Sequence, residues 1–123
     1  MTEYIITNNP LVHKKYNEKF KVDYLEISYM KVLKYVRDKI HVGHKLLTHP
    51  LSGSIKPNET PYKSIIISKE TNTLDIESLM VIEDSIVTAD KFINKIGNRK
   101  YDENSLEDFK IVDLSLIDNC VKK

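Results

Sequence analysis

The sequence predicts a compact three-layer α/β/α domain, in which a mostly parallel sheet of four strands lies between two layers of helices. Short β-branched runs alternate along the chain with segments whose apolar residues recur at helical spacing. Strands joined through helices run parallel, and their crossovers are right-handed. A length of 123 residues, without repeats or low-complexity segments, fits a single domain over residues 1–123.

The first elements follow from β-branched runs and from proline. Residues 3–7, "EYIIT", form a strand that stops at "NNP", because Asn favours turns and Pro10 has no N–H for a ladder. Pro10 suits a first helical turn, so residues 10–20 are expected to contain one or two turns of helix. Residues 20–27 alternate apolar and polar side chains, which predicts an edge strand with one wetter side.

The middle of the chain holds a helix followed by two apolar runs. Ser28 is in the position of an N-cap, and apolar residues at helical spacing predict a helix over 29–42 that ends at Gly43. The run at 44–49 is expected to be a short buried strand. Residues 64–69 contain three consecutive isoleucines, which indicates a strand buried on both faces.

The second half is predicted to be mainly helical. Asp75 is expected to cap the longest helix, which would end at Gly97. Its apolar residues alternate spacings of three and four and form one stripe: Leu79, Ile82, Ile86, Ala89, Ile93 and Ile96. This stripe is expected to pack on the sheet, or alternatively to form part of a homodimer seam. A final helix is predicted over 105–121, although 109–117 also fits an extended segment.

The predicted strand order is 2-1-3-4, in a Rossmann-like or flavodoxin-like topology. Ligands of such sheets bind beyond the carboxyl ends of the strands, where the strand order reverses. Two polar loops would meet there, the loop after the first strand and the loop of residues 48–63. They provide the candidate ligand-binding residues Thr7, Asn8, Asn9, Thr48, His49, Ser52, Gly53, Ser54, Lys56, Asn58, Glu59, Thr60 and Lys63.

The loop of residues 48–63 contains three of the four prolines and is longer than most loops inside compact domains. Its hydroxyls, amides and lysines suit a small anion such as a carboxylate or a phosphate, and Gly53 would let backbone N–H groups approach it. The alternative is a rigid structural loop whose polar groups satisfy its own backbone.

Histidines and the single cysteine give little support for metal or nucleophilic chemistry. His41, His44 and His49 do not have the spacing of a helical metal-binding pair, so no metal site is expected. His49 is the candidate general acid or base. No nucleophile elbow, phosphate-binding glycine fingerprint or cysteine accompanies it, and Cys120 is expected to be incidental, so no cofactor is predicted.

Composition excludes several classes of protein. A formal net charge of +1 is too small for a nucleic-acid-binding face, and the apolar runs are too short to span a membrane. Residues 1–20 lack the pattern of a secretory signal, which predicts a cytoplasmic location. The acidic residues near the C-terminus are expected on a solvated helix face: Glu103, Glu107, Asp108, Asp113 and Asp118.

The segments "YIITNNPLV" and "LLTHPLSGSIKPNETPYKSIIIS" resemble the GrdX family, small proteins associated with the glycine, sarcosine and betaine reductase gene clusters of amino-acid-fermenting anaerobes. The resemblance extends along the whole chain and is weaker after Ile96. It implies a cytoplasmic protein of reductive amino-acid fermentation, and it supplies no catalytic residues.

Two hypotheses of function follow. In the first, the protein is a non-catalytic accessory that binds a small anionic metabolite, or a component of glycine or betaine reductase, through the two loops. In the second, it is a small enzyme in which His49 acts as acid or base and Lys56 or Lys63 holds the anion.

Overall fold

The computed structural model describes residues 3–53, 55–96 and 101–121. The described elements follow one another as β1 (Glu3–Thr7), α1 (Pro10–Tyr16), β2 (Lys21–Tyr24), α2 (Tyr29–Val42), β3 (Ser64–Ser68), α3 (Ile76–Asp90), the π-helical segment η1 (Lys91–Ile96) and α4 (Glu103–Cys120).

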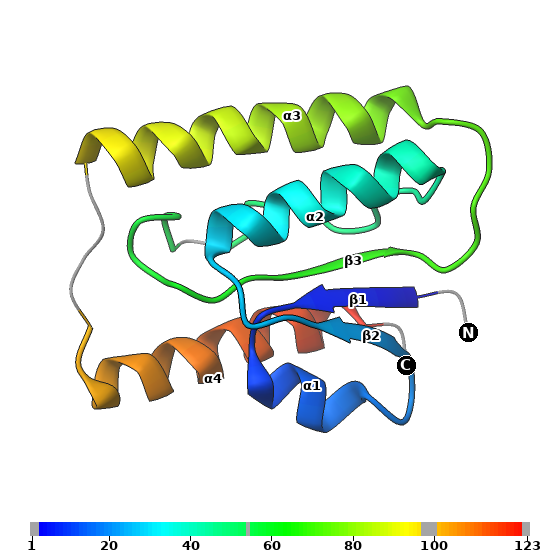
Figure 1. Ribbon diagram of the computed structural model, residues 1–123. Helices are drawn as coiled ribbons and strands as arrows, with labels where there is room; N and C mark the ends of the chain where they lie inside the picture. The colour runs from blue at the N-terminus through cyan, green and yellow to red at the C-terminus, as the bar shows by residue number, and fades with distance from the viewer. Residues whose placement is uncertain (1–2, 54, 97–100, 122–123) are drawn as a thin grey trace.

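A three-stranded mixed sheet lies at the centre of the molecule, in the order β2-β1-β3 (Figure 1). β1 and β2 are parallel, with Ile5 opposite Val22, whereas β1 and β3 are antiparallel, with Ile5 opposite Ile66. The edge position predicted for residues 20–27 is confirmed by β2. The burial predicted for residues 64–69 is confirmed too, because β3 is almost fully buried.

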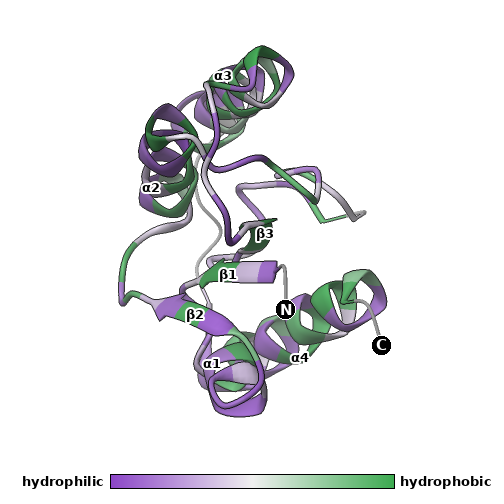
Figure 2. Ribbon diagram, turned by 90° about the vertical axis from the view of Figure 1, so that its right-hand side faces the viewer, coloured by the Kyte–Doolittle hydropathy of each residue, from purple (hydrophilic) through white to green (hydrophobic). Residues whose placement is uncertain are grey.

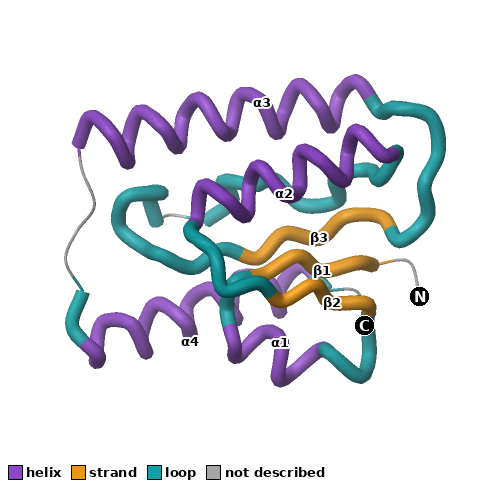
Figure 3. The backbone as a smooth tube through the Cα atoms, viewed as in Figure 1, coloured by secondary structure: helices purple, strands orange, loops and turns teal. Residues whose placement is uncertain are grey.

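The predicted four-stranded, mostly parallel sheet is wrong, and so is the Rossmann-like or flavodoxin-like topology that was expected with it. Residues 44–49 form no strand and make a single isolated bridge, between Leu46 and Ile67 of β3. The route of the chain explains the error. The segment after α2 crosses the molecule as a loop and reaches the edge of the sheet where β1 ends, so β3 must run back in the opposite direction (Figure 3). Burial on both faces did not reveal the direction of β3, nor that β3 is the last described strand at its side of the sheet.

Helices cover both faces of the sheet, with α2 on one face and α1 and α4 on the other (Figure 2). The strands divide their side chains between the two sides with period two. In β1, for example, Ile6 packs with α2 whereas Ile5 packs with α1 and α4. α3 forms an outer layer over α2, and its predicted stripe faces inward: Ile82 and Ala89 are fully buried in the core that α2 shares with the sheet.

The predicted helix boundaries depend on local capping chemistry and are largely confirmed. The Ser28 side chain accepts a hydrogen bond from the Lys31 N–H at the start of α2, and Gly43 ends that helix with a φ of 122°. Asp75 caps α3 as expected. Gly97, the expected end of this helix, lies outside the described residues. The final helix is confirmed by α4, so the extended alternative for residues 109–117 is wrong.

Several chain segments that are distant in sequence meet at one end of the strands of the sheet. β1 and β2 end there, β3 begins there, and α2 begins only a few residues after β2. The loop before β3 and the N-terminal half of α4 also reach this end of the sheet (Figure 1). In the described ranges, no helix combines the length and apolar character needed to cross a membrane.

Candidate functional site

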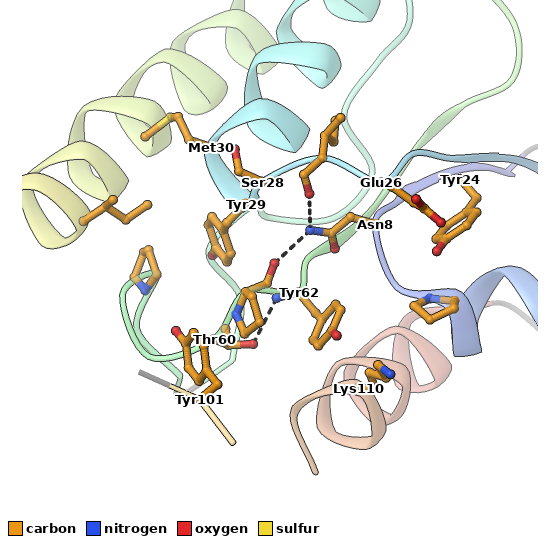
Figure 4. A pocket seen from close by; sticks show the side chains of 15 residues that line it. Asn8, Tyr24, Glu26, Ser28, Tyr29, Met30, Thr60, Tyr62, Tyr101 and Lys110 are labelled. Atoms are coloured by element: carbon orange, nitrogen blue, oxygen red, sulfur yellow. Dashed lines mark hydrogen bonds between the residues drawn. The ribbon is translucent and has the colours of Figure 1, made fainter. Parts of the chain in front are cut away.

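A pocket of about 630 Å³ opens at the edge of the sheet where β1 and β2 end (Figure 4). Tyrosines, prolines and aliphatic side chains make up most of its wall, with few charged groups. The lining residues are Asn8, Pro10, Tyr24, Glu26, Ile27, Ser28, Tyr29, Met30, Pro57, Thr60, Pro61, Tyr62, Ile93, Tyr101 and Lys110. The volume is typical of sites for small organic ligands.

Asn8 ties the two sides of this pocket together. Its side-chain nitrogen donates to the carbonyls of Ile27, at 2.9 Å, and of Pro61, at 2.8 Å (Figure 4). Its side-chain oxygen accepts from the backbone N–H of Lys63 at 2.8 Å. Both donor hydrogens of the amide are therefore used within the protein. Asn8 holds the segment before α2 against the segment before β3, and so it sets the width of the pocket.

Beneath the pocket lies a buried polar network centred on Asp113 of α4. One carboxylate oxygen, Oδ2, accepts hydrogen bonds from the Asn9 side chain at 3.0 Å and from the Ser64 hydroxyl at 2.7 Å. The Thr7 hydroxyl lies 2.6 Å from that of Ser64. Asn9 also caps α1, because its side-chain oxygen accepts from the Leu11 N–H at 3.0 Å. These bonds join β1, β3, α1 and α4 at one point.

Asp113 and Lys63 face a small second cavity next to the pocket. Its volume is about 10 Å³, roughly the room for one water molecule. Burial raises the pKa of Asp113, and the hydrogen bonds from Asn9 and Ser64 and the charge of Lys63 oppose that rise. Burial lowers the pKa of Lys63, and the charge of Asp113 opposes the decrease. Each group therefore takes up its neutral form more readily than it would in water.

The charged groups of the large pocket, Glu26 and Lys110, lie near two tyrosines. Burial raises the pKa of Tyr24, and the negative charge of Glu26 raises it further, whereas Lys110 opposes the increase. Lys110 donates to Glu107 at 2.8 Å, and its ammonium nitrogen lies 5.8 Å from the centre of the Tyr62 ring. The pocket thus offers one cation and one anion among largely apolar walls.

Comparison with known protein families matches residues 4–122 to the family described as GrdX-like protein. The chain belongs to the GrdX-like protein family. The resemblance expected from the sequence is therefore confirmed over nearly the whole chain. The same comparisons found no match among curated proteins and none among solved structures.

The described residues that were predicted to bind a ligand in this GrdX-like chain occupy four kinds of position. Asn8 and Thr60 line the large pocket, and Thr60, Ser52 and Lys63 line the small cavity. Thr7 and Asn9 are buried in the network around Asp113. The other described candidates line neither space: Thr48, His49, Gly53, Lys56, Asn58 and Glu59. Ser54 lies outside the described residues.

Contacts within the loop explain several of these positions. The Thr48 hydroxyl accepts from the Ile66 N–H at 3.0 Å and so anchors the loop on β3. The His49 ring is exposed, and its Nδ1 accepts from the Leu51 N–H at 3.1 Å. Gly53 has a φ of +100°, and a Cβ there would lie 2.9 Å from a Leu116 methyl. The positive φ therefore favours glycine here, because residues with a side chain rarely adopt it, and the Leu116 side chain would also have to shift.

Sequence reasoning missed Asp113 of the GrdX-like chain, which was expected on a solvated helix face. The structure corrects this, because the Asp113 residue is only 6 % exposed. A signal was present in the sequence: Phe109 and Ile117 lie four residues before and after Asp113, which places all three on one helical face.

The pocket tyrosines were missed for a different reason. They come from three separate parts of the chain, and no local pattern relates all of them: Tyr24 and Tyr29 at the end of β2 and the start of α2, Tyr62 before β3, and Tyr101 before α4. In the part of the chain that the structure describes, no three His, Cys, Asp or Glu side chains lie close enough together to hold a metal ion.

Proposed function

We propose that this GrdX-like protein is a non-catalytic accessory of glycine, sarcosine and betaine reductase metabolism, and that it binds a small anionic metabolite in the 630 Å³ pocket. The observation that carries the proposal is the position of this pocket, between the ends of β1 and β2, the start of α2 and Lys110. Membership of the family supports the reductase setting.

Two groups of the pocket suit the negative end of such a ligand. α2 is 14 residues long, and its first turn, at Ser28, Tyr29 and Met30, lines the wall. The backbone N–H groups of a first turn attract anions, and the helix dipole adds to this attraction. Lys110 supplies a positive charge on the α4 side, which it shares with Glu107, whereas Glu26 repels an anion from its own part of the wall. A carboxylate or phosphate is therefore expected between α2 and Lys110.

The remaining wall suits an uncharged organic body. Met30, Ile93, Pro57 and the tyrosine rings offer apolar surface, which favours a ligand with carbon groups beyond its anionic end. The volume favours a ligand larger than glycine, because specific sites usually enclose most of the surface of the molecule they bind.

Binding without catalysis fits the positions of the reactive side chains. His49 is exposed and lies outside the pocket, and Cys120 is exposed near the end of α4. Neither side chain lines the space in which the ligand is expected, so neither is placed to attack it or to exchange a proton with it.

A thermal-shift screen tests the proposal. The probes are glycine, sarcosine, betaine, acetyl phosphate, phosphate, sulfate and common nucleotides, each measured with the wild type and with Lys110→Gln. A compound at about a hundred times its Kd stabilises the native state by roughly 2.7 kcal/mol, which raises the Tm of a domain of this size by several degrees.

The matched control is Lys34→Gln, which removes an exposed lysine from α2 away from the pocket. The proposal expects Lys110→Gln to reduce the shift and Lys34→Gln to preserve it. An equal loss in both variants, or the absence of a shift with every compound, would contradict the metabolite site and favour a reductase subunit as the occupant.

A further inference from the structure

A second feature, independent of the ligand of the large pocket, is the side chain of Lys63. The residue is only 6 % exposed, and its ammonium nitrogen has one hydrogen bond, to the Ser52 carbonyl at a long 3.4 Å. No ion pair of Lys63 occurs among the described residues. A buried ammonium with one long hydrogen bond for its three donors is poorly solvated, and this favours the neutral amine.

Asp113 provides a complementary group in the same cavity. The carboxyl is held in place by Asn9 and Ser64, which bond to its Oδ2. It lines the cavity together with Lys63 and Tyr29, and its negative charge acts to raise the pKa of both side chains. Burial raises the pKa of this carboxyl, so the cavity combines an amine inclined to be neutral with a carboxyl inclined to hold its proton.

We propose that Lys63 is a nucleophilic amine that forms a reversible imine with a small aldehyde, and that Asp113 is the acid for this step. The Lys63 nitrogen lone pair attacks the aldehyde carbon, and the carbonyl oxygen takes up one of the two protons of that nitrogen to give a carbinolamine. Asp113 then protonates the hydroxyl, which leaves as water while the nitrogen forms the C=N bond. The proton lost from nitrogen returns to the Asp113 carboxylate, so the net reaction is amine plus aldehyde giving imine plus water.

The size of the cavity and its surroundings determine the class of substrate. A space of about 10 Å³ has room for about one water molecule, which suits the carbonyl oxygen, so the rest of the molecule must extend out of the cavity. A small aldehyde is favoured, because it carries only hydrogen on one side of its carbonyl carbon. Bulkier ketones would collide with the walls. The Lys63 amine lies close to the protein surface, because Ser52, whose carbonyl accepts its hydrogen bond, is exposed. Tyr29, Thr60 and Tyr62 also separate this cavity from the large pocket by a single layer of side chains.

Reductive trapping tests the proposal. The folded wild type is incubated at pH 7 with acetaldehyde and sodium cyanoborohydride, which reduces an imine to a stable ethylated amine, and peptide mapping locates the adducts over time. Exposed lysines are almost fully protonated at this pH. Lys63 is expected to be ethylated severalfold faster than the exposed Lys34 of α2, and to keep reacting at lower pH, where Lys34 no longer does.

Two variants separate a reactive role from a structural one. Lys63→Arg keeps a cation at the site and should remove only the fast adduct. Asp113→Asn keeps a hydrogen-bond acceptor for the network and should slow ethylation of Lys63 while leaving that of Lys34 unchanged. If either variant fails to fold, the rates in the wild type still decide. Ethylation of Lys63 no faster than that of Lys34, or only after denaturation, would overturn the proposal whatever the large pocket binds.

Discussion

At the scale of single residues, the side chains of the two asparagines that follow β1 form hydrogen bonds with other protein groups. Asn8 makes three side-chain hydrogen bonds and Asn9 makes three, all to groups of other segments or to the first turn of α1. Their residue type and their position after a strand predicted a role at this end of the sheet. Their side-chain amides hold this end of the sheet together. Asn8 joins the segment before α2 to the segment before β3, and Asn9 joins the end of β1 to α4.

Asn8→Ala is expected to destabilise the protein and to disturb the large pocket. The change leaves the Lys63 N–H and the carbonyls of Ile27 and Pro61 without their side-chain partner. A buried polar group that loses its partner costs about 1–3 kcal/mol. Urea denaturation should therefore show a loss in the free energy of unfolding of at least this size.

The control for this prediction is Asn72→Ala, which changes an exposed asparagine before α3. It should leave the free energy of unfolding within about 0.5 kcal/mol of the wild type, as surface substitutions usually do. Equal stability of the two variants would mean that Asn8 does not hold the walls together.

At the scale of elements, the end of α2 depends on backbone conformation and on close contact. Gly43 has a φ of 122°, and its N–H closes the last turn by donating to the Ile40 and Lys39 carbonyls. Asn72 donates its backbone N–H to the Gly43 carbonyl, which brings the segment before α3 against the helix end. A Cβ at residue 43 would lie 2.2 Å from the Asn72 carbonyl oxygen.

Gly43→Ala is expected to destabilise the protein by more than about 1 kcal/mol, because alanine disfavours this φ and its methyl group would displace the Asn72 backbone. The measurement is the Tm together with the free energy of unfolding in urea. Val42→Ala, at the adjacent exposed position, is the matched control and should change little. A Gly43→Ala protein as stable as the control would contradict the structure of this helix end.

The elements also show how far local patterns reach. Ser28, Gly43 and Asp75 are read from the sequence because a cap interacts with groups one to four residues away. For Asp113, the sequence of α4 allowed two positions, on the solvated face of the helix or on its inner face. Its charge suggested solvent, while its register with Phe109 and Ile117 placed it on the inner face. The inner reading is correct because Asn9 and Ser64 satisfy the carboxylate there.

At the scale of the whole molecule, the long apolar stripe of α3 packs inside the chain. Ile82 is fully buried with residues of α2 and the sheet, whereas Ile76 at the start of the same helix is 57 % exposed. The described residues of the stripe therefore pack against the core that α2 shares with the sheet. The homodimer seam stays a prediction.

Ile82→Ala is expected to lower the free energy of unfolding by about 2–5 kcal/mol, the usual effect of leaving a cavity in a core. Ile76→Ala makes the same chemical change at an exposed position and should have a much smaller effect. Urea denaturation measures both, and light scattering at micromolar concentration reports the mass. A change of oligomeric state with Ile82→Ala, at unchanged stability, would support the seam.

The sequence by itself predicted the family, the helices, the caps and all three strands, because caps and periodicities depend on near neighbours along the chain. It also directed attention to the end of the sheet where the two cavities lie, through Asn8, Thr60 and Lys63. Only the tertiary structure decided the direction of β3, the isolated bridge at Leu46 and the pocket whose tyrosines come from three separate parts of the chain. The reason is physical: strand direction and pocket walls depend on where the chain returns after a long loop, and no local periodicity records that path.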